Sequence, residues 1–361
     1  GDWSSDVCSS DLSGSFLDDD QRDKLLKDLE RQRQAISGPI ADHNPALAVE
    51  LFWDLLAMAE GLIDRCDDSD AVVRDFFHDC SAALGSVAQK APGDPKALAD
   101  QVYAAIVSNS YGQFDPILRD LGPALGPEGL GHLRQRLELL RARHASNEQA
   151  NNYRDLKVRI AMLGIADALG DAEAYWAEYR DHDPRALMVP AIAADVARRL
   201  TPAGRAEEAL ALLQGAEPGL AKRRAGAEDW CDARLAALEA LGRGEEAQAQ
   251  RWEFALMELS PRHLRDYLKR VPDFEDMVHE EKALDLVAEH DDLGEALWFF
   301  LQWPEPHRAA RLVLNAPKSL NGDRYLLLAP LAELLEKPHP LAATRCLRDR
   351  KSTRLNSSHR T

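Results

Sequence analysis

The chain has 361 residues, enough for two domains of about 150 residues or one elongated array of repeats. Its 61 acidic residues outnumber its 44 basic residues and give a net charge of -17, which argues against binding to nucleic acid or to an anionic membrane surface. No apolar run reaches the roughly 18 residues of a membrane-spanning helix, so no membrane segment is expected.

The two ends of the chain do not resemble natural protein. Residues 2–12 (DWSSDVCSSDL) and 349–358 (DRKSTRLNSS) are related through their DNA, because the reverse complement of one nucleotide sequence for the first segment encodes the second. Separate segments of a folded protein have no physical reason to be related in this way. We therefore interpret residues 1–12 and 349–361 as sequencing-adapter artefacts and base the fold prediction on residues 13–348.

Residues 13–147 predict an N-terminal helical domain. Alternating β-branched runs are absent, and the patterned segments are rich in Ala, Leu, Glu and Arg, which favour helices. Helices are expected near 17–36, 45–60, 69–84, 95–108, 115–121 and 128–147. A capping residue before proline marks six expected helix starts along the whole chain: Asn44-Pro45, Asp94-Pro95, Asp115-Pro116, Asp183-Pro184, Thr201-Pro202 and Ser260-Pro261. Glycines are expected to end helices at Gly61, Gly85, Gly170 and Gly242.

An acidic cluster follows the second expected helix. Carboxylate oxygens bind Ca²⁺ and Mg²⁺, so Asp64, Asp67 and Asp68 are candidate metal ligands. The glycine and glutamate that an EF-hand loop requires are missing from this segment. The alternative is a solvated loop in which Asp68 or Ser69 caps the helix that begins near Val72.

The cysteines predict no catalytic, disulfide or zinc site. His78 and Cys80 could suggest a nucleophilic pair, but Phe76, Phe77 and Leu84 favour a buried helix face there. Cys66, Cys231 and Cys346 are widely scattered, and no CxxC pair occurs. This usage favours a reducing, cytoplasmic location, and no cofactor is expected.

An aromatic loop follows the helix expected at 95–108. Tyr111 and Phe114 could bind a partner, since loops often carry recognition residues. The alternative is structural: Asp115 caps the next helix, and the two rings pack beside it.

Residues 152–348 predict a second domain of tetratricopeptide-like helical repeats. The polar run at 144–152 is the candidate boundary between the domains, or alternatively the exposed end of one long helix. A glycine turn followed by acidic residues and alanine recurs at Gly170, Gly204 and Gly242, with spacings of 34 and 38 residues. Tetratricopeptide units, each a helical hairpin, have a period of about 34 residues. The full tetratricopeptide signature is absent.

The segment 267–276 is the other candidate binding surface. Pro272 breaks a helix, Asp273 can cap the next one, and Phe274 lies between them. An exposed turn of this kind would bind a partner through Tyr267, Lys269, Arg270 and Phe274.

Several phrases carry a resemblance to a known family: ELFWDLL (50–56), RCDDSD (65–70), SNSYGQFDPIL (108–118), LRDYLKRVPDFEDM (264–277), NGDRYLLLAPLAELLE (321–336) and HPLAAT (339–344). Together they resemble a bacterial, all-helical family catalogued only as a domain of unknown function. The resemblance implies a helical-repeat fold and supplies no catalytic residues.

The sequence therefore predicts an all-α, elongated α-solenoid of helical hairpins. The expected function is a scaffold that binds a protein or peptide. No G-x-G-x-x-G, G-x-x-x-x-G-K-[ST] or G-x-S-x-G motif is present, which disfavours common nucleotide-dependent and serine-hydrolase chemistry. Two alternatives stay open: a metal-dependent enzyme using the carboxylates near 64–70, or a structural accessory domain of a larger protein.

Overall fold

The computed structural model describes residues 16–144, 148–218, 226–316, 320 and 323–357. These residues form helices and turns without any strand, and their one β feature is an isolated bridge between Leu17 and Cys66. The predicted all-α fold is confirmed. The interpreted artefact at residues 1–12 lies outside the described residues, and so do the side chains of residues 349–361.

The chain divides into two compact units, Gly1–Pro184 and Arg185–Thr361. This division comes later than the boundary predicted at residues 147–152. The physical reason is that α9 (Glu148–Leu169) packs against α8 (Ile117–His144), and α10 (Ala172–His182) packs against α9. The polar run therefore connects two helices of the first unit.

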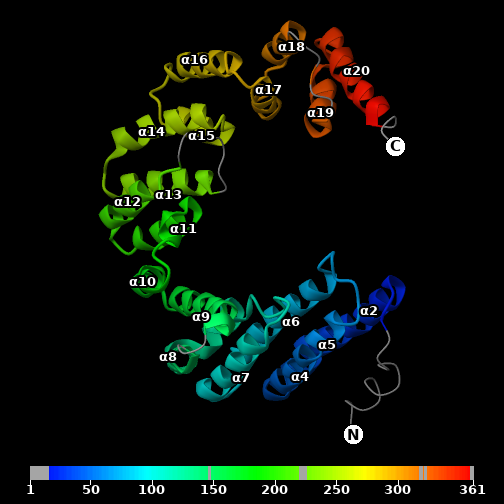
Figure 1. Cartoon of the computed structure of the whole chain (residues 1–361), viewed down its shortest axis with the longest axis vertical. Helices are drawn as coiled ribbons and strands as arrows, with labels where there is room; N and C mark the ends of the chain where they lie inside the picture. The colour runs from blue at the N-terminus through cyan, green and yellow to red at the C-terminus, as the bar shows by residue number, and fades with distance from the viewer. Residues whose placement is uncertain (1–15, 145–147, 219–225, 317–319, 321–322, 358–361) are drawn as a thin grey trace. The chain divides into compact units, whose positions relative to one another are not determined.

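The first unit begins with α2 (Asp19–Ala35), which a π-helical turn, Ile36–Ile40, joins to α3 (Ala41–His43). The helices that follow, up to α8, are α4 (Pro45–Ala57), α5 (Ala59–Ile63), α6 (Val72–Ala88) and α7 (Pro95–Ser108) (Figure 1). Helix α8 combines the two helices predicted at 115–121 and 128–147. They meet at a kink where Gly126 adopts φ 57°, between Pro123 and Pro127.

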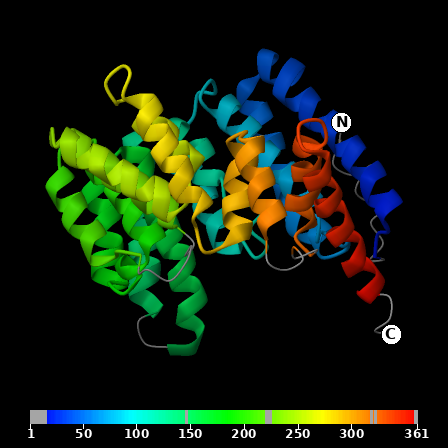
Figure 2. The same cartoon turned by 90° about the horizontal axis from the view of Figure 1, so that it is seen from above.

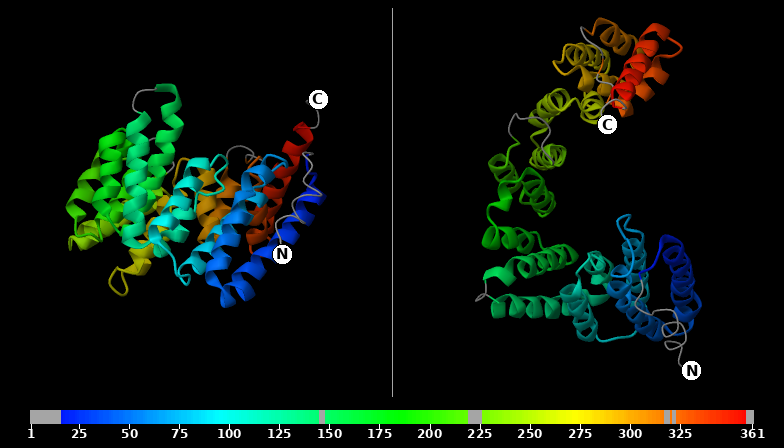
Figure 3. Two further views of the ribbon diagram at one scale, coloured as in Figure 1. Left: turned by 90° about the horizontal axis from the view of Figure 1, so that it is seen from below. Right: turned by 45° about the vertical axis from the view of Figure 1, so that its right-hand side comes forward.

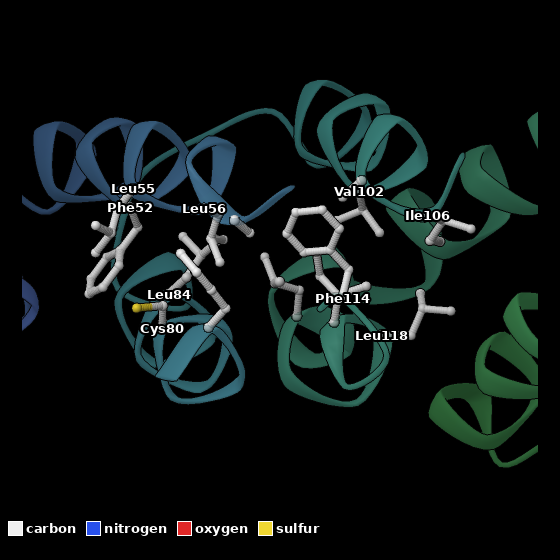
Figure 4. Close-up of a cluster of buried hydrophobic side chains, with 14 of the residues drawn as sticks. Phe52, Leu55, Leu56, Cys80, Leu84, Val102, Ile106, Phe114 and Leu118 are labelled. Atoms are coloured by element: carbon white, nitrogen blue, oxygen red, sulfur yellow. The ribbon is translucent and has the colours of Figure 1, made fainter. Parts of the chain in front are cut away.

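The core of the first unit lies between these helices. Figure 4 shows Phe52 and Leu56 of α4 facing Cys80 and Leu84 of α6. All four side chains are buried. Burial of such large apolar side chains is the main favourable term that holds the helices together.

The second unit contains a short 3₁₀ turn, Ala186–Met188, and ten helices in its described residues. They are α11 (Pro190–Leu200), α12 (Ala206–Gly215), α13 (Ala227–Ala240), α14 (Gly244–Met257), α15 (Pro261–Leu268), α16 (Asp276–Ala288), α17 (Leu293–Gln302), α18 (Pro306–Asn315), α19 (Tyr325–Leu335) and α20 (Pro340–Ser357). Helices next to each other in sequence pack together, as α11 does with α12 and α13 with α14 (Figures 1 and 3). A core of this unit's own runs from Ala255 to Cys346 and includes Phe299 and Phe300.

The three repeated glycines adopt the same backbone geometry. Gly170, Gly204 and Gly242 have φ of 64°, 79° and 71°, a left-handed conformation that glycine adopts without a side-chain clash. In each turn, the residue after the glycine donates its N–H to a carbonyl five residues earlier, as Arg243 does to Leu238. This is the hydrogen-bonding pattern of a Schellman helix end. The turns join α9 to α10, α11 to α12 and α13 to α14. The same turn geometry therefore recurs between three pairs of consecutive helices.

Three of the six expected helix starts are confirmed. The side chains of Asn44, Asp94 and Ser260 each accept a hydrogen bond from a backbone N–H in the first helical turn. Asp115 instead accepts from the side chain of Asn109, and Asp183 precedes only the 3₁₀ turn. The helix start predicted at Thr201 was wrong. The Thr201 hydroxyl donates to the carbonyl of Ala197 in the helix that Thr201 ends.

Two of the expected helix-ending glycines were also wrong. Gly61 lies inside α5. Gly85 lies inside α6, where the position that a side chain would occupy is against the backbone of α8. Gly85 is needed for close helix packing and not for a turn.

Candidate functional site

The aromatic loop at 109–116 is anchored to the first unit by a buried ring and by side-chain hydrogen bonds. The Phe114 side chain is buried in the core of the first unit (Figure 4). The Tyr111 hydroxyl donates to the Asp64 carboxylate, which ties the loop to the segment after α5. This bond raises the pKa of Tyr111. The buried Phe114 ring is part of the core, whereas the Tyr111 ring is exposed and bonded through its hydroxyl. The structural alternative therefore fits Phe114, although Asp115 does not cap the next helix.

The acidic cluster serves the protein's own backbone. Asp68 accepts hydrogen bonds from the N–H groups of Val73 and Arg74, at 2.8 and 3.2 Å, in the first turn of α6. Asp67 accepts from the N–H of Ser69, and this bond lowers the pKa of Asp67.

The other carboxylates of the cluster also have partners. Asp64 receives the Tyr111 hydroxyl, and Asp70 lies 3.2 Å from the guanidinium of Arg22. Among the described residues, no three His, Cys, Asp or Glu side chains converge where they could hold a metal ion. Asp64, Asp67 and Asp68 are thus not brought together as the metal hypothesis required.

We expect Asp68→Ala to destabilise the first unit by about 1 kcal/mol, the typical effect of losing a helix-capping side chain. The two N–H groups at the start of α6 would lose their acceptor, because Ala71, which precedes α6, provides no side-chain cap. Hydrogen exchange of α6 measures the change in the first unit. Asp68→Asn keeps one of the two acceptor oxygens and should recover part of the loss. An equal loss in both variants would contradict the capping role.

The four cysteines of the described residues are buried and free. Burial raises the pKa of Cys80 and of Cys231 to about 12. His78 directs its ring nitrogen Nε2 to the backbone oxygen of Gly112, at 2.9 Å. A buried, protonated thiol is a poor nucleophile, so Cys80 acts as a core residue.

We expect Cys80 and Cys231 to resist alkylation by iodoacetamide at pH 8 until the protein unfolds. Only the thiolate reacts, and a pKa of about 12 leaves almost none of it at this pH. Mass spectrometry of peptides from native and urea-unfolded protein measures the labelling of each site. Rapid labelling of native Cys80 would instead indicate an accessible, activated thiol.

The turn between α15 and α16 has an unusual backbone for its sequence. Phe274 adopts φ 76°, and the N–H of Glu275 donates to the carbonyl of Pro272 at 3.1 Å. Turns with a positive φ at this position usually place glycine or asparagine there. A bulky side chain in this conformation is strained by about 1–2 kcal/mol.

This turn and the start of α16 expose three apolar side chains. Phe274, Met277 and Val278 have exposed fractions of 91%, 74% and 68%. We call these three residues the Phe274 surface. Figure 2 shows the yellow loop between α15 and α16 standing out from the helices that it joins. Exposed apolar side chains that are close in sequence are candidates for an interaction site.

A packed cluster of aromatic side chains connects the helices on the two sides of the turn. The Tyr267 hydroxyl lies 3.0 Å from Nδ1 of His279, which links the end of α15 to α16. Trp252 of α14 packs on both rings, with centroid distances of 5.0 Å to Tyr267 and 5.8 Å to His279. Burial, and secondly the charge of Glu275, raises the pKa of Tyr267. The cluster holds the two helix ends in one arrangement.

The four residues predicted to bind a partner at this turn therefore have different roles. Phe274 is exposed as expected, but the buried Tyr267 supports the turn from within. Lys269 pairs with Asp266 at 3.4 Å, and Arg270 lies 3.6 Å from Glu239. The sequence did not predict Met277 and Val278 as exposed residues of this site, because apolar residues in the first turn of a helix usually indicate burial.

We expect Phe274→Gly to stabilise the second unit by about 1 kcal/mol, because glycine relieves the strain of a positive φ. Little burial is lost, since the ring is almost fully exposed. Phe274→Ala is the matched control: it removes the ring, keeps the strain and should leave the stability nearly unchanged. Hydrogen exchange of α15 and α16 measures both effects; equal stability of the two variants would contradict the strain.

A second feature of this unit is a cavity of about 430 Å³. The starts of α13 and α15 line one part of it, and Trp298 and Gln302 of α17 line another. His263 on its wall is buried, and its Nε2 lies 3.0 Å from Oδ1 of Asp232. Burial alone would raise the pKa of Asp232, but hydrogen bonds from His263 and Arg262 hold it below its usual range. Sequence spacing gave no signal for this pairing.

No helix in the described residues combines the length and apolar character needed to cross a membrane.

The family of the chain follows from its similarity to known proteins. No curated protein and no solved structure matches the chain. Residues 9–360 match a family of unknown function, DUF6880, and this range overlaps both segments interpreted as adapter-derived. Since the match covers nearly all of the sequence, the chain belongs to the DUF6880 family.

Proposed function

We propose that this protein is a protein-binding module and that the Phe274 surface is its contact site. The observation that carries the proposal is Phe274 itself: a large apolar side chain that is 91% exposed on a strained, left-handed backbone. Both features are unfavourable for the isolated fold, because exposed apolar area and backbone strain each cost free energy. Strain of this kind is often found where a residue serves function.

The support beneath the turn favours binding as well. The contact between Tyr267 and His279 and the packing of Trp252 hold the turn in place before any partner arrives. A preorganised surface loses less conformational entropy on association than a flexible loop does. A single aromatic anchor in such a setting can supply much of the binding free energy.

Site-specific photocrosslinking tests this function. The photoreactive amino acid p-benzoylphenylalanine replaces Phe274 in the full chain, and the protein is irradiated in a lysate of the source organism. The control carries the same amino acid at Leu341, which is 71% exposed on α20 of the same unit. We expect a protein crosslinked at position 274 and not at position 341. No crosslinked protein, or the same set of proteins at both positions, would refute the function.

A further inference from the structure

The shape of the Phe274 surface restricts the kind of partner. Phe274 is 91% exposed, and it lies in the loop between α15 and α16 that stands out from these helices (Figure 2). The surface is therefore a protrusion and not a groove. A protruding aromatic side chain is desolvated only when its partner provides a pocket around it, as hot-spot residues require. An extended peptide has no pocket of its own, and a folded protein does.

The charges around the surface restrict the partner further. Asp273, Glu275 and Asp276 alternate with the apolar residues, and none of these carboxylates forms an ion pair with another described residue. Two carboxylates farther along α16, Glu281 and Asp285, are already paired with Arg308. Three carboxylates without an ion pair among the described residues therefore lie at the turn, where a partner would meet them.

We propose that the partner of the Phe274 surface is a folded protein that takes Phe274 into an apolar pocket bordered by Lys or Arg side chains. This inference rests on the proposed binding function. Complementary charge at the border of an interface guides association and selects the partner, and its effect weakens as salt screens it.

The experiment uses the full chain and the purified protein captured by crosslinking at position 274. The variant Asp273→Asn, Glu275→Gln, Asp276→Asn removes the three unpaired charges and keeps hydrogen-bonding side chains at the start of α16. We expect its affinity, measured by calorimetry in low salt, to fall at least tenfold. The dependence of affinity on salt should become weaker at the same time.

The matched control is Glu50→Gln, Asp54→Asn, Glu336→Gln. It changes the net charge by the same amount at exposed positions on α4 and at the end of α19. Its affinity should stay within twofold of the unmodified protein. Circular dichroism confirms that both variants keep their helices, and single substitutions at Asp273 replace the triple variant if α16 unfolds.

A second arm tests the pocket. The crosslinked stretch of the partner, made as a synthetic peptide, should bind at least tenfold more weakly than the intact partner. Equal affinities of peptide and intact partner would overturn the folded-pocket inference, and equal affinities of the two charge variants would overturn the basic border. Either result leaves the binding function standing. If nothing is crosslinked at position 274, the function and this inference both fail.

Discussion

Gly85→Ala is expected to destabilise the first unit by about 3 kcal/mol, near the upper end of the usual cost of overpacking. A Cβ atom at Gly85 would lie 2.2 Å from the backbone oxygen of Asp120 and 2.8 Å from its carbonyl carbon. Ordinary Cβ contacts are longer than 3.4 Å. Because the obstructing atoms are backbone, no side-chain rotation can relieve the clash, and α6 must move away from α8.

Gly131→Ala is the matched control for this substitution. Gly131 is also inside a helix, α8, but a Cβ there would meet no atom within 4 Å. Alanine should stabilise the unit at this position by about 0.5–1 kcal/mol, the usual difference between alanine and glycine in a helix. Hydrogen exchange of α6 and α8 provides the measurement, since a chain of two units need not unfold in one transition. Similar effects of the two substitutions would show that Gly85 is not a close-packing residue.

Phe300→Ala is expected to destabilise the second unit by about 3–5 kcal/mol, the usual range for a buried phenylalanine. The Phe300 side chain is fully buried, and its ring lies 5.7 Å from that of Phe299 in an edge-to-face arrangement. Truncation would remove apolar burial and leave a cavity among α17, α18 and α19, whose residues belong to the same core.

Leu326→Ala is the control, because Leu326 lies on α19 with its side chain mostly exposed. Its effect should be below about 0.5 kcal/mol. Hydrogen exchange should show lost protection in α17–α19 of the Phe300 variant. It should also show unchanged protection in α4–α8, whose core consists of other residues. Equal loss in both units would contradict the presence of two separate cores.

Local signals in the sequence predicted much of the helical structure. The helix at 95–108 has the predicted bounds because Asp94 caps it and Pro95 occupies its first position. Gly170 and Gly242 end helices as expected, because their turns need a left-handed residue. Gly85 was wrongly expected to end a helix. A glycine is needed there because the backbone carbonyl of Asp120, on another helix, lies too close for a side chain, and no local sequence pattern reveals this contact.

The candidate site was only partly predictable for a similar reason. The break at Pro272 identified the turn, and Phe274 was named as part of it. The exposed positions of Met277 and Val278 were not identified, because sequence periodicity cannot tell an apolar face covered by a neighbouring helix from one left uncovered. The burial of Tyr267 likewise depends on Trp252 and His279, which come from other helices.

The affinity of the Phe274→Gly variant for the captured partner tests most directly whether Phe274 is a binding residue. Under the proposed function, the fold tolerates a strained, exposed phenylalanine because a partner binds it. We therefore expect this variant to be more stable than the unmodified protein and to bind the partner at least tenfold more weakly in calorimetry. A variant that gains stability and keeps its full affinity would contradict the role of Phe274 in binding, because the strain would then serve no contact.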